Sequence, residues 1–126
     1  MLREIGDIMN MYQLSFLGDA VFELMVREYA ISKNKVKLND LQQFTLGFVT
    51  AKRQAFFLEK LEENSFLSEE EADIVRRGRN IKTHKSPKNC DMITYKRSTA
   101  FEVLIGYLYI NDKNRLKEVF NYIILL

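Results

Sequence analysis

The stretch from Leu14 to Val26, "LSFLGDAVFELMV", sets a glycine and an aspartate, Gly18 and Asp19, inside an apolar run. Apolar residues recur there at helical spacing, which predicts one amphipathic helix over residues 11 to 32. In the interior of such a helix a glycine costs about 1 kcal/mol relative to alanine, and a desolvated carboxylate costs more unless something binds it. We therefore expect Asp19 to have a binding partner. The inward residues are expected to be Leu14, Leu17, Val21, Leu24 and Ile31.

A narrow polar ridge is expected on this helix, because four polar side chains stand four residues apart. They are Ser15, Asp19, Glu23 and Arg27, and the apolar residues Phe16, Ala20, Phe22 and Val26 reach almost to them. We interpret Glu23 as a supporting or structural group. A second helix, expected from about Tyr95 to Ile110, has one charged residue after Ser98, namely Glu102, and a glycine four residues beyond it, Gly106.

Two apolar helices that each carry one acid and one glycine can cross closely and place Asp19 beside Glu102. Neighbouring carboxylates raise each other's pKa unless a cation lies between them. Magnesium is commonly held by one or two carboxylates plus phosphate oxygens of a substrate, so Asp19 and Glu102 are candidate catalytic residues and metal ligands, with manganese as a possible substitute. The alternative is that both acids form ordinary ion pairs, Asp19 with Arg27 and Glu102 with a neighbouring lysine.

Positive charge is concentrated between residues 76 and 97, which contain eight lysines and arginines against Asp91 alone, although the whole chain carries a net charge of only +2. Such a concentration is typical of a polyanion-binding surface, although a solvated loop that confers solubility is the alternative. Because the basic segment leads directly into the Glu102 helix, phosphate-binding residues and metal ligands are close in sequence, which favours phosphodiester chemistry. The candidate contacts are Arg76, Arg77, Arg79, Asn80, Lys82, Lys85, Lys88, Lys96 and Arg97.

The fold class is expected to be all-α, with about five or six helices in a single domain over residues 1–126. From Asn39, a good N-cap, a second helical region runs through Glu63 and is expected to break near Gly47. Its inward residues are expected to be Leu41, Phe44, Phe48, Ala55 and Leu58.

The later part of the chain is expected to contain a short helix, a basic loop and two further helices. Ser68 and Glu71 form a capping box that opens the short helix, and Gly78 is expected to end it. Residues 79–94 show neither helical nor strand periodicity and are expected to be a loop. The last helix has inward residues Leu116, Val119, Phe120, Ile123 and Ile124.

The numbers of cysteine and histidine residues and the lengths of the apolar runs argue against several classes of function. One cysteine, Cys90, forbids an internal disulfide, and with one histidine, His84, it cannot build a structural zinc site or a catalytic triad. The longest apolar run, Val103 to Ile110, is too short to span a bilayer, and the charged N-terminus is unlike a signal peptide. We therefore expect a cytoplasmic protein that does not associate with membranes.

At the same residues the sequence resembles the ribonuclease III family, in particular its short form. The family signature Glu-Arg-Leu-Glu-Phe-Leu-Gly-Asp-Ala aligns with Tyr12 to Ala20, and its last five residues match completely. A second block, Asp-Val-Phe-Glu-Ala-Leu-Ile, aligns with Thr99 to Ile105. Tyr12, Ser15 and Thr99 replace acids of the full-length enzymes, a thinner carboxylate set that the short form shares.

This resemblance implies a homodimeric, all-helical endonuclease domain that cuts double-stranded RNA with magnesium and leaves 5′-phosphate and 3′-hydroxyl ends. It implies that Asp19 and Glu102 are metal ligands, that Phe16 lies at the dimer interface, and that Lys52 is a further RNA contact. The short form is known for maturing the precursor of large-subunit ribosomal RNA, and the resemblance implies a ribosomal protein that presents the substrate as a further partner. The chain ends soon after its last helix, which predicts no double-stranded RNA-binding domain.

Two other classes of function stay open at the level of sequence. A non-catalytic RNA-binding or ribosome-associated module would keep the fold and bind RNA without metal or cleavage. A helical DNA-binding or scaffold dimer would show no preference for the A-form duplex.

Overall fold

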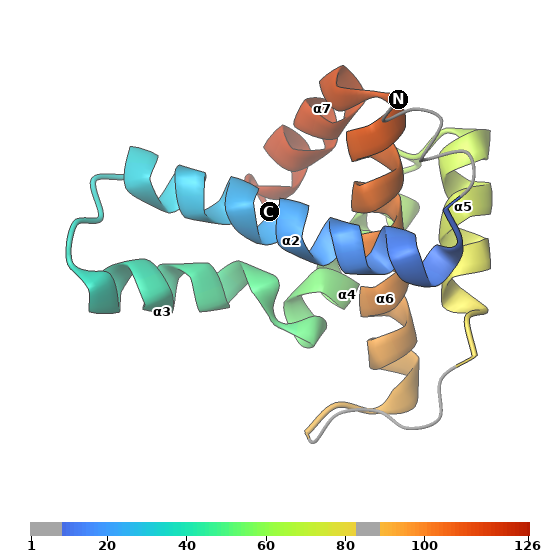
Figure 1. Cartoon of the computed structure of the whole chain (residues 1–126), viewed down its shortest axis with the longest axis horizontal. Helices are drawn as coiled ribbons and strands as arrows, with labels where there is room; N and C mark the ends of the chain where they lie inside the picture. The colour runs from blue at the N-terminus through green and yellow to red at the C-terminus, as the bar shows by residue number, and fades with distance from the viewer. Residues whose placement is uncertain (1–8, 83–88) are drawn as a thin grey trace.

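In the computed structural model, residues 9–82 and 89–126 are described, and their regular structure consists of six α-helices without a strand. This confirms the expected all-α class. The helices, drawn in Figure 1, are α2 (Met11–Ser32), α3 (Leu38–Val49), α4 (Ala51–Glu63), α5 (Glu69–Arg79), α6 (Met92–Asn111) and α7 (Lys113–Ile123). No helix of this described part has the length and apolar character that crossing a membrane requires.

Helix α6 lies at the centre of the molecule and packs against α2, α4, α5 and α7. Every residue from Ser98 to Gly106 is buried except Glu102, which is half-buried. A helix that is apolar on all sides is stable only when other elements surround it, which explains this central place. Phe101 of α6 meets Phe22 of α2 edge-on with ring centroids 5.0 Å apart, so the core ties these two helices together.

The boundaries of α2 and the start of α5 are as the sequence predicts. Helix α2 spans residues 11 to 32, and the Ser68–Glu71 capping box opens α5 with both of its reciprocal hydrogen bonds. Helix α6 begins three residues earlier than expected, because the Asp91 side chain accepts a hydrogen bond from the backbone N–H of Thr94 and caps it.

Gly78 does not end α5, which corrects the sequence-based expectation. The helix continues through Arg79, and Gly78 is buried inside it. A Cβ atom at Gly78 would lie 3.1 Å from the Cα of Ala100 and 3.2 Å from the Cβ of Val103. The glycine therefore lets α5 approach α6 closely.

The expected N-cap at Asn39 and the expected break at Gly47 are also wrong. Helix α3 begins at Leu38 with Lys37 as its N-cap, and Asn39 lies in its first turn. The chain breaks at Thr50, whose extended backbone and side-chain oxygen cap the start of α4. A hydroxyl that accepts from a free helical N–H stabilises a new helix start, whereas a helical glycine alone need not interrupt a helix.

Two of the expected inward residues of α2 are exposed, Leu24 by 59% and Ile31 by 64%. Figure 1 shows the cause: the second half of α2 extends beyond α6 beside α3, so fewer elements cover it. Of the inward residues expected between 39 and 63, Ala55 and Leu58 are buried, whereas Leu41, Phe44 and Phe48 are only half-buried. The extended helix pair therefore has a narrower buried face than its periodicity predicts.

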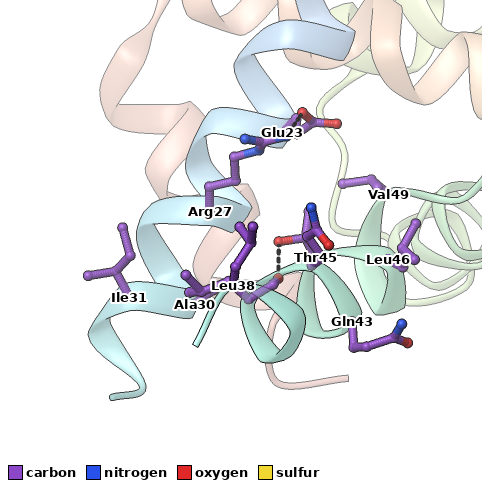
Figure 2. Close-up of a pocket in the computed structure, with 11 residues that line it drawn as sticks. Glu23, Arg27, Ala30, Ile31, Leu38, Gln43, Thr45, Leu46 and Val49 are labelled. Atoms are coloured by element: carbon purple, nitrogen blue, oxygen red, sulfur yellow. Dashed lines mark hydrogen bonds and ion pairs between the residues drawn. The ribbon is translucent and has the colours of Figure 1, made fainter. Parts of the chain in front are cut away.

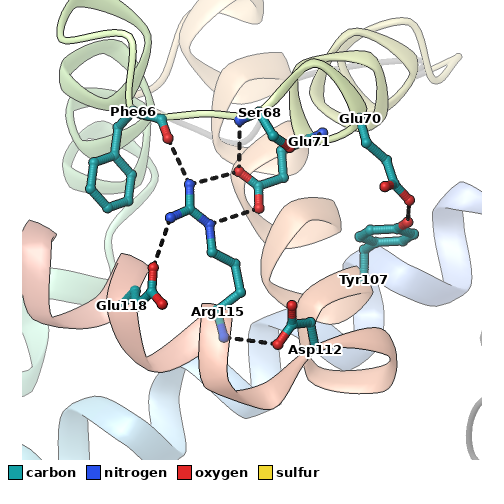
Figure 3. Close-up of polar contacts among 8 residues, drawn as sticks. All are labelled: Phe66, Ser68, Glu70, Glu71, Tyr107, Asp112, Arg115 and Glu118. Carbon is teal, nitrogen blue, oxygen red and sulfur yellow. Dashed lines mark hydrogen bonds and ion pairs between the residues drawn. The ribbon is translucent and has the colours of Figure 1, made fainter.

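Arg115 of α7 connects that helix to the segment between α4 and α5 (Figure 3). Its guanidinium donates to both carboxylate oxygens of Glu71, at 2.8 and 2.9 Å, and to the carbonyl oxygen of Phe66 at 2.6 Å. Burial raises the pKa of Glu71, but the hydrogen bonds from Arg115 and Ser68 outweigh it and hold that pKa below its usual value. Nearby, the Tyr107 hydroxyl donates to the Glu70 carboxylate.

Candidate active site at the crossing of two helices

Helices α2 and α6 touch through backbone atoms where they cross (Figure 1). A Cβ atom on Gly18 would lie 1.8 Å from the carbonyl oxygen of Glu102, and one on Gly106 would lie 2.2 Å from the carbonyl oxygen of Leu14. Any side chain at either position would force the helices apart. The crossing that the glycine pattern predicts is therefore present, and it explains why a glycine interrupts each apolar run.

The crossing brings Asp19 and Glu102 together, with Ser15 beside them. The Ser15 hydroxyl donates to Glu102 Oε1 at 3.0 Å. Burial, a hydrogen bond with the Asp19 carboxyl group and the charge of Asp19 raise the pKa of Glu102 to about 8, and the bond from Ser15 only partly offsets this. In the absence of a cation the Glu102 carboxyl group is therefore mostly protonated at neutral pH.

A divalent cation fits this carboxylate pair. The Glu102 carboxyl group lies within hydrogen-bonding reach of the Asp19 carboxyl group, and a cation between two such carboxylates would remove their repulsion. Among residues 9–82 and 89–126, no group of three or more acidic, histidine or cysteine side chains gathers at one place. A metal held here would have two protein carboxylates and would complete its shell from water and substrate oxygens.

The ion-pair alternative for the two acids is not found in the described part of the chain. Arg27, the partner considered for Asp19, pairs instead with Glu23 at 2.8 Å. No lysine or arginine of that part lies within ion-pair distance of Asp19 or Glu102. The role assigned to Glu23, a structural one, agrees with this pairing.

The two acids open into a pocket of about 430 Å³. Tyr12 at its edge is 57% exposed, and its hydroxyl donates to the carbonyl oxygen of Lys82 at 2.9 Å, which ties the start of α2 to the segment after α5. Lysine and arginine are absent from the described residues that line it. These are Tyr12, Ser15, Phe16, Asp19, Val49, Ala51, Gln54, Tyr95, Ser98 and Glu102.

The predicted RNA contacts lie outside this pocket, although three of them adjoin its wall in sequence. Lys52 follows Ala51, and Lys96 and Arg97 lie between Tyr95 and Ser98. Lys52 is exposed on α4, whereas Lys96 and Arg97 are half-buried on α6. These three residues are therefore the basic side chains nearest in sequence to the described wall of the pocket, and none of them forms part of it.

Some of the other predicted RNA contacts are paired with acidic residues of the protein. Arg76 pairs with Asp73 at 2.6 Å and Arg79 with Glu62 at 3.0 Å. Arg77, Asn80 and Lys82 are exposed at the end of α5 and beyond it. Lys85 and Lys88, together with His84, lie outside the described residues. Two acids, Asp73 on the same helix and Glu62 on α4, thus neutralise part of the basic cluster.

Sequence reasoning missed Gln54, Tyr95 and Ser98 as parts of the pocket wall. A signal for Gln54 was present: it stands four and seven residues before Leu58 and Leu61, two fully buried residues of α4. A polar side chain in register with an inward apolar face is either paired inside the protein or exposed to a cavity. Tyr95 and Ser98 carried no comparable signal.

A second hollow of about 440 Å³ lies between α2 and α3 and is shown in Figure 2. Its walls are mainly apolar, with Ile31, Leu38 and Leu46 among them, and the Glu23–Arg27 ion pair stands at its margin. Thr45 faces it and donates its hydroxyl to the Leu41 carbonyl oxygen at 2.8 Å. This hollow contains no pair of carboxylates, so the candidate chemistry belongs to the first pocket.

The family model of the Ribonuclease III domain matches residues 12–113, a span that includes both crossing helices. The chain therefore belongs to the ribonuclease III family, which confirms the resemblance seen in the sequence. Among its relatives, Mini-ribonuclease 3 of Staphylococcus aureus is 43% identical over 118 residues, covering 93% of this chain and 88% of that protein. Mini-ribonuclease 3 of Symbiobacterium thermophilum is 46% identical over 107 residues, covering 84% and 81%.

The fold agrees with that of a solved relative. A protein from Fusobacterium nucleatum, known from a crystal structure, superposes with a TM-score of 0.82 at 30% identity. The superposition covers 93% of this chain and 94% of that chain. The helices that position Asp19 and Glu102 thus belong to a fold that the two proteins share over most of their lengths.

Proposed function

We propose that this chain is an endoribonuclease that cleaves double-stranded RNA with magnesium and leaves 5′-phosphate and 3′-hydroxyl ends. The observation that carries the proposal is the Asp19–Glu102 pair, which the glycine crossing holds together without a basic partner among the described residues. Membership of the ribonuclease III family supports the reaction class. As substrate we propose the precursor of large-subunit ribosomal RNA, which is what the resemblance of the sequence to the short form of the family implies.

In this mechanism Asp19 and Glu102 would hold a divalent cation, and a cation bound there would supply an activated water and neutralise charge on the scissile phosphate. Ser15 fixes the orientation of the Glu102 carboxylate through its hydrogen bond to Oε1. Because Glu102 is half-buried and its pKa is about 8, it must lose its proton before both carboxylates can bind the cation. The apolar core around α6 keeps the crossing rigid, so the two acids are already positioned when RNA arrives.

RNA is held, in this proposal, by the basic residues around the pocket, with Lys52, Lys96 and Arg97 closest to the acids in sequence. A-form RNA is recognised through its shape, its phosphates and its 2′-hydroxyls. Each neutralised phosphate releases counterions, so binding should weaken steeply as salt rises. The cytoplasmic location and a ribosomal protein that presents the substrate are parts of the same proposal.

We also propose that the active form is a homodimer with Phe16 at the interface. Phe16 is 84% exposed although it lies on a helix whose other phenylalanine, Phe22, is fully buried. An exposed aromatic ring beside a catalytic pocket is favourable only when another surface covers it. Two sites related by a two-fold axis would also suit the two antiparallel strands of the substrate.

A cleavage assay on structured double-stranded RNA tests the proposed function. Wild-type protein should cut the duplex with magnesium and fail with a chelator, and Glu102→Gln should bind the RNA but not cut it. Glu23→Gln is the matched control, because it changes an acid of the same ridge that is paired with Arg27 and should leave cleavage intact. Binding without cleavage by the wild type, on several duplexes and with manganese as well, would contradict the enzyme proposal and favour an RNA-binding module.

A further inference from the structure

Gln54 of α4 is a buried polar residue whose side chain has no partner within the described part of the protein. The residue is only 2% exposed, and no hydrogen bond joins its amide to another described residue. No fully buried side-chain nitrogen or oxygen atom of the described part lacks a partner, so the amide atoms of Gln54 must be accessible to water. Five polar or charged residues are buried in all in that part, and each of the other four makes an internal side-chain hydrogen bond. Those four are Thr45, Glu71, Ser98 and Thr99.

An amide that makes no hydrogen bond inside the protein needs water or a ligand as its partner. Gln54 lies in the wall of the pocket that contains Asp19 and Glu102. Because the residue lines this pocket and its amide atoms are accessible, the partner is whatever occupies the pocket. Water can fill that role in the free protein, and a bound substrate can replace the water.

The chemistry of the pocket indicates what the partner is. Two of the pocket's hydroxyl groups are already engaged, that of Ser15 with Glu102 and that of Ser98 with the Tyr95 carbonyl oxygen. The carboxylates are acceptors that a cation would occupy. An RNA strand that places a phosphate beside that cation presents further anionic oxygens, and these need donors.

A neutral amide is well suited to this position. A lysine or arginine there would pair with Asp19 or Glu102 and compete with the cation, whereas an amide N–H can donate without neutralising the acids. Hydrogen bonds to a charged acceptor are also stronger than those between neutral groups.

We infer that Gln54 is a substrate-binding residue whose side-chain amide nitrogen donates a hydrogen bond to a phosphate oxygen of the RNA strand in the pocket. This inference rests on the proposed function of the same site. It assigns the buried amide a role in the complex that it lacks in the free protein.

The first test is Gln54→Met, which keeps the length and volume of the side chain but removes its hydrogen-bonding groups. We expect cleavage under single-turnover conditions to fall about 10- to 100-fold at saturating magnesium. The melting temperature of the RNA-free variant should stay unchanged or rise, because an unpaired amide has been removed. A glutamine with a purely structural role would give the opposite result, a lower melting temperature with normal cleavage.

Thr45→Val is the matched control, since Thr45 is buried on the neighbouring helix and lies outside the active-site pocket. Its hydroxyl already has an internal partner, the Leu41 carbonyl oxygen. The control should therefore lower the melting temperature and leave the cleavage rate of the folded protein unchanged. A loss of cleavage in Gln54→Met no larger than that in this control would overturn the inference.

A second variant, Gln54→Glu, separates the donor role from an acceptor role. It keeps the shape and the acceptor oxygens but replaces the amide nitrogen by a further negative oxygen. If the partner is a phosphate oxygen, Gln54→Glu should cleave more slowly than Gln54→Met. If Gln54→Glu cleaved at the wild-type rate, the interaction with RNA would be made by the side-chain oxygen, and the proposed hydrogen bond from the amide nitrogen would be wrong.

RNA binding with calcium in place of magnesium gives a readout that does not require cleavage. We expect Gln54→Met to weaken binding of the same duplex about tenfold at equal ionic strength. If wild-type protein binds the duplex but does not cut it, the proposed reaction is wrong while Gln54 is still tested by binding. Equal binding and equal cleavage by wild type and Gln54→Met would overturn the inference alone.

Discussion

Glu71 and Glu102 are the same residue type in two partly enclosed places of one small protein, and their surroundings act on them in opposite directions. Glu71 accepts two hydrogen bonds from Arg115, and its pKa is lowered. Glu102 lies beside Asp19, and its pKa is raised to about 8. The first carboxylate has its counter-charge inside the protein, and the second has none among the described residues. A carboxylate whose counter-charge must come from outside is a candidate for binding and catalysis.

The largest effect we expect concerns the crossing that creates the Glu102 environment. Gly18→Ala would place a Cβ atom 1.8 Å from the Glu102 carbonyl oxygen, so the helices must separate. We expect a loss of at least about 3 kcal/mol in the free energy of unfolding, measured by denaturant titration. Gly47→Ala is the control, since a Cβ there meets nothing within 4 Å, and it should stabilise the protein by up to about 1 kcal/mol.

If both alanine variants had the same stability, the close crossing of α2 and α6 would be wrong. The same would follow if Gly18→Ala lost no cleavage activity beyond what its unfolded fraction explains.

The second prediction compares the two glutamates directly. Glu71→Gln removes the carboxylate that accepts two hydrogen bonds from Arg115, which keeps only the more exposed Glu118 as an acidic partner, at 3.0 Å. Because Arg115 is partly exposed and keeps this second partner, we expect a loss of about 1–3 kcal/mol. Glu102→Gln removes an acid that burial and Asp19 disfavour in its charged form, so at pH 8 without metal it should not destabilise the protein. Thermal unfolding of both variants at pH 8 with a chelator checks this. Equal destabilisation of the two variants would contradict the claim that the surroundings of Glu71 and Glu102 act on their charges in opposite directions.

The third prediction is the pH dependence of stability, which has opposite signs for the two residues. The pKa of Glu102 is raised in the folded state, so its contribution to the free energy of unfolding is fully present below pH 4.5. That contribution is lost as the pH rises toward about 8, with a slope of up to about 1.4 kcal/mol per pH unit. Because the pKa of Glu71 is lowered, its contribution is present above 4.5 and is lost as acid protonates the folded protein.

Denaturant titrations from about pH 2 to pH 8, without metal, cover the ranges in which both groups titrate and measure both slopes. The decline above pH 4.5 should disappear in Glu102→Gln, and magnesium should reduce it in the wild type. A decline that persists unchanged in Glu102→Gln would mean that another group titrates.

The sequence predicted the helices whose periodicity and caps agree, such as residues 11–32 and the Ser68 start of α5. It also predicted the crossing, because each of two apolar helices carried one acid and one glycine. It misassigned Gly47 and Gly78, since a glycine in a helix can be an end, an exposed site or a close contact, and only the packing neighbour decides. Gly78 has Ala100 and Val103 against it, whereas Gly47 has nothing.

The sequence predicted only part of the candidate site, for a related reason. Asp19 and Glu102 stood out against apolar surroundings, but the pocket between them depends on α4, whose placement the sequence does not give. Gln54 became visible only when α4 was packed beside the crossing. The sequence also did not show that Arg79 has an acidic partner, because Glu62 lies seventeen positions away on another helix.

The most direct test of the central claim is the single-turnover cleavage rate of Glu102→Gln and Glu71→Gln on the same RNA duplex, each corrected for its folded fraction. We predict that Glu102→Gln is folded but cleaves at least about 10³-fold more slowly than the wild type, because one of the two carboxylates that hold the cation is lost. Glu71→Gln should be less stable and cleave normally. Normal cleavage by Glu102→Gln would contradict the assignment of the crossing as the active site.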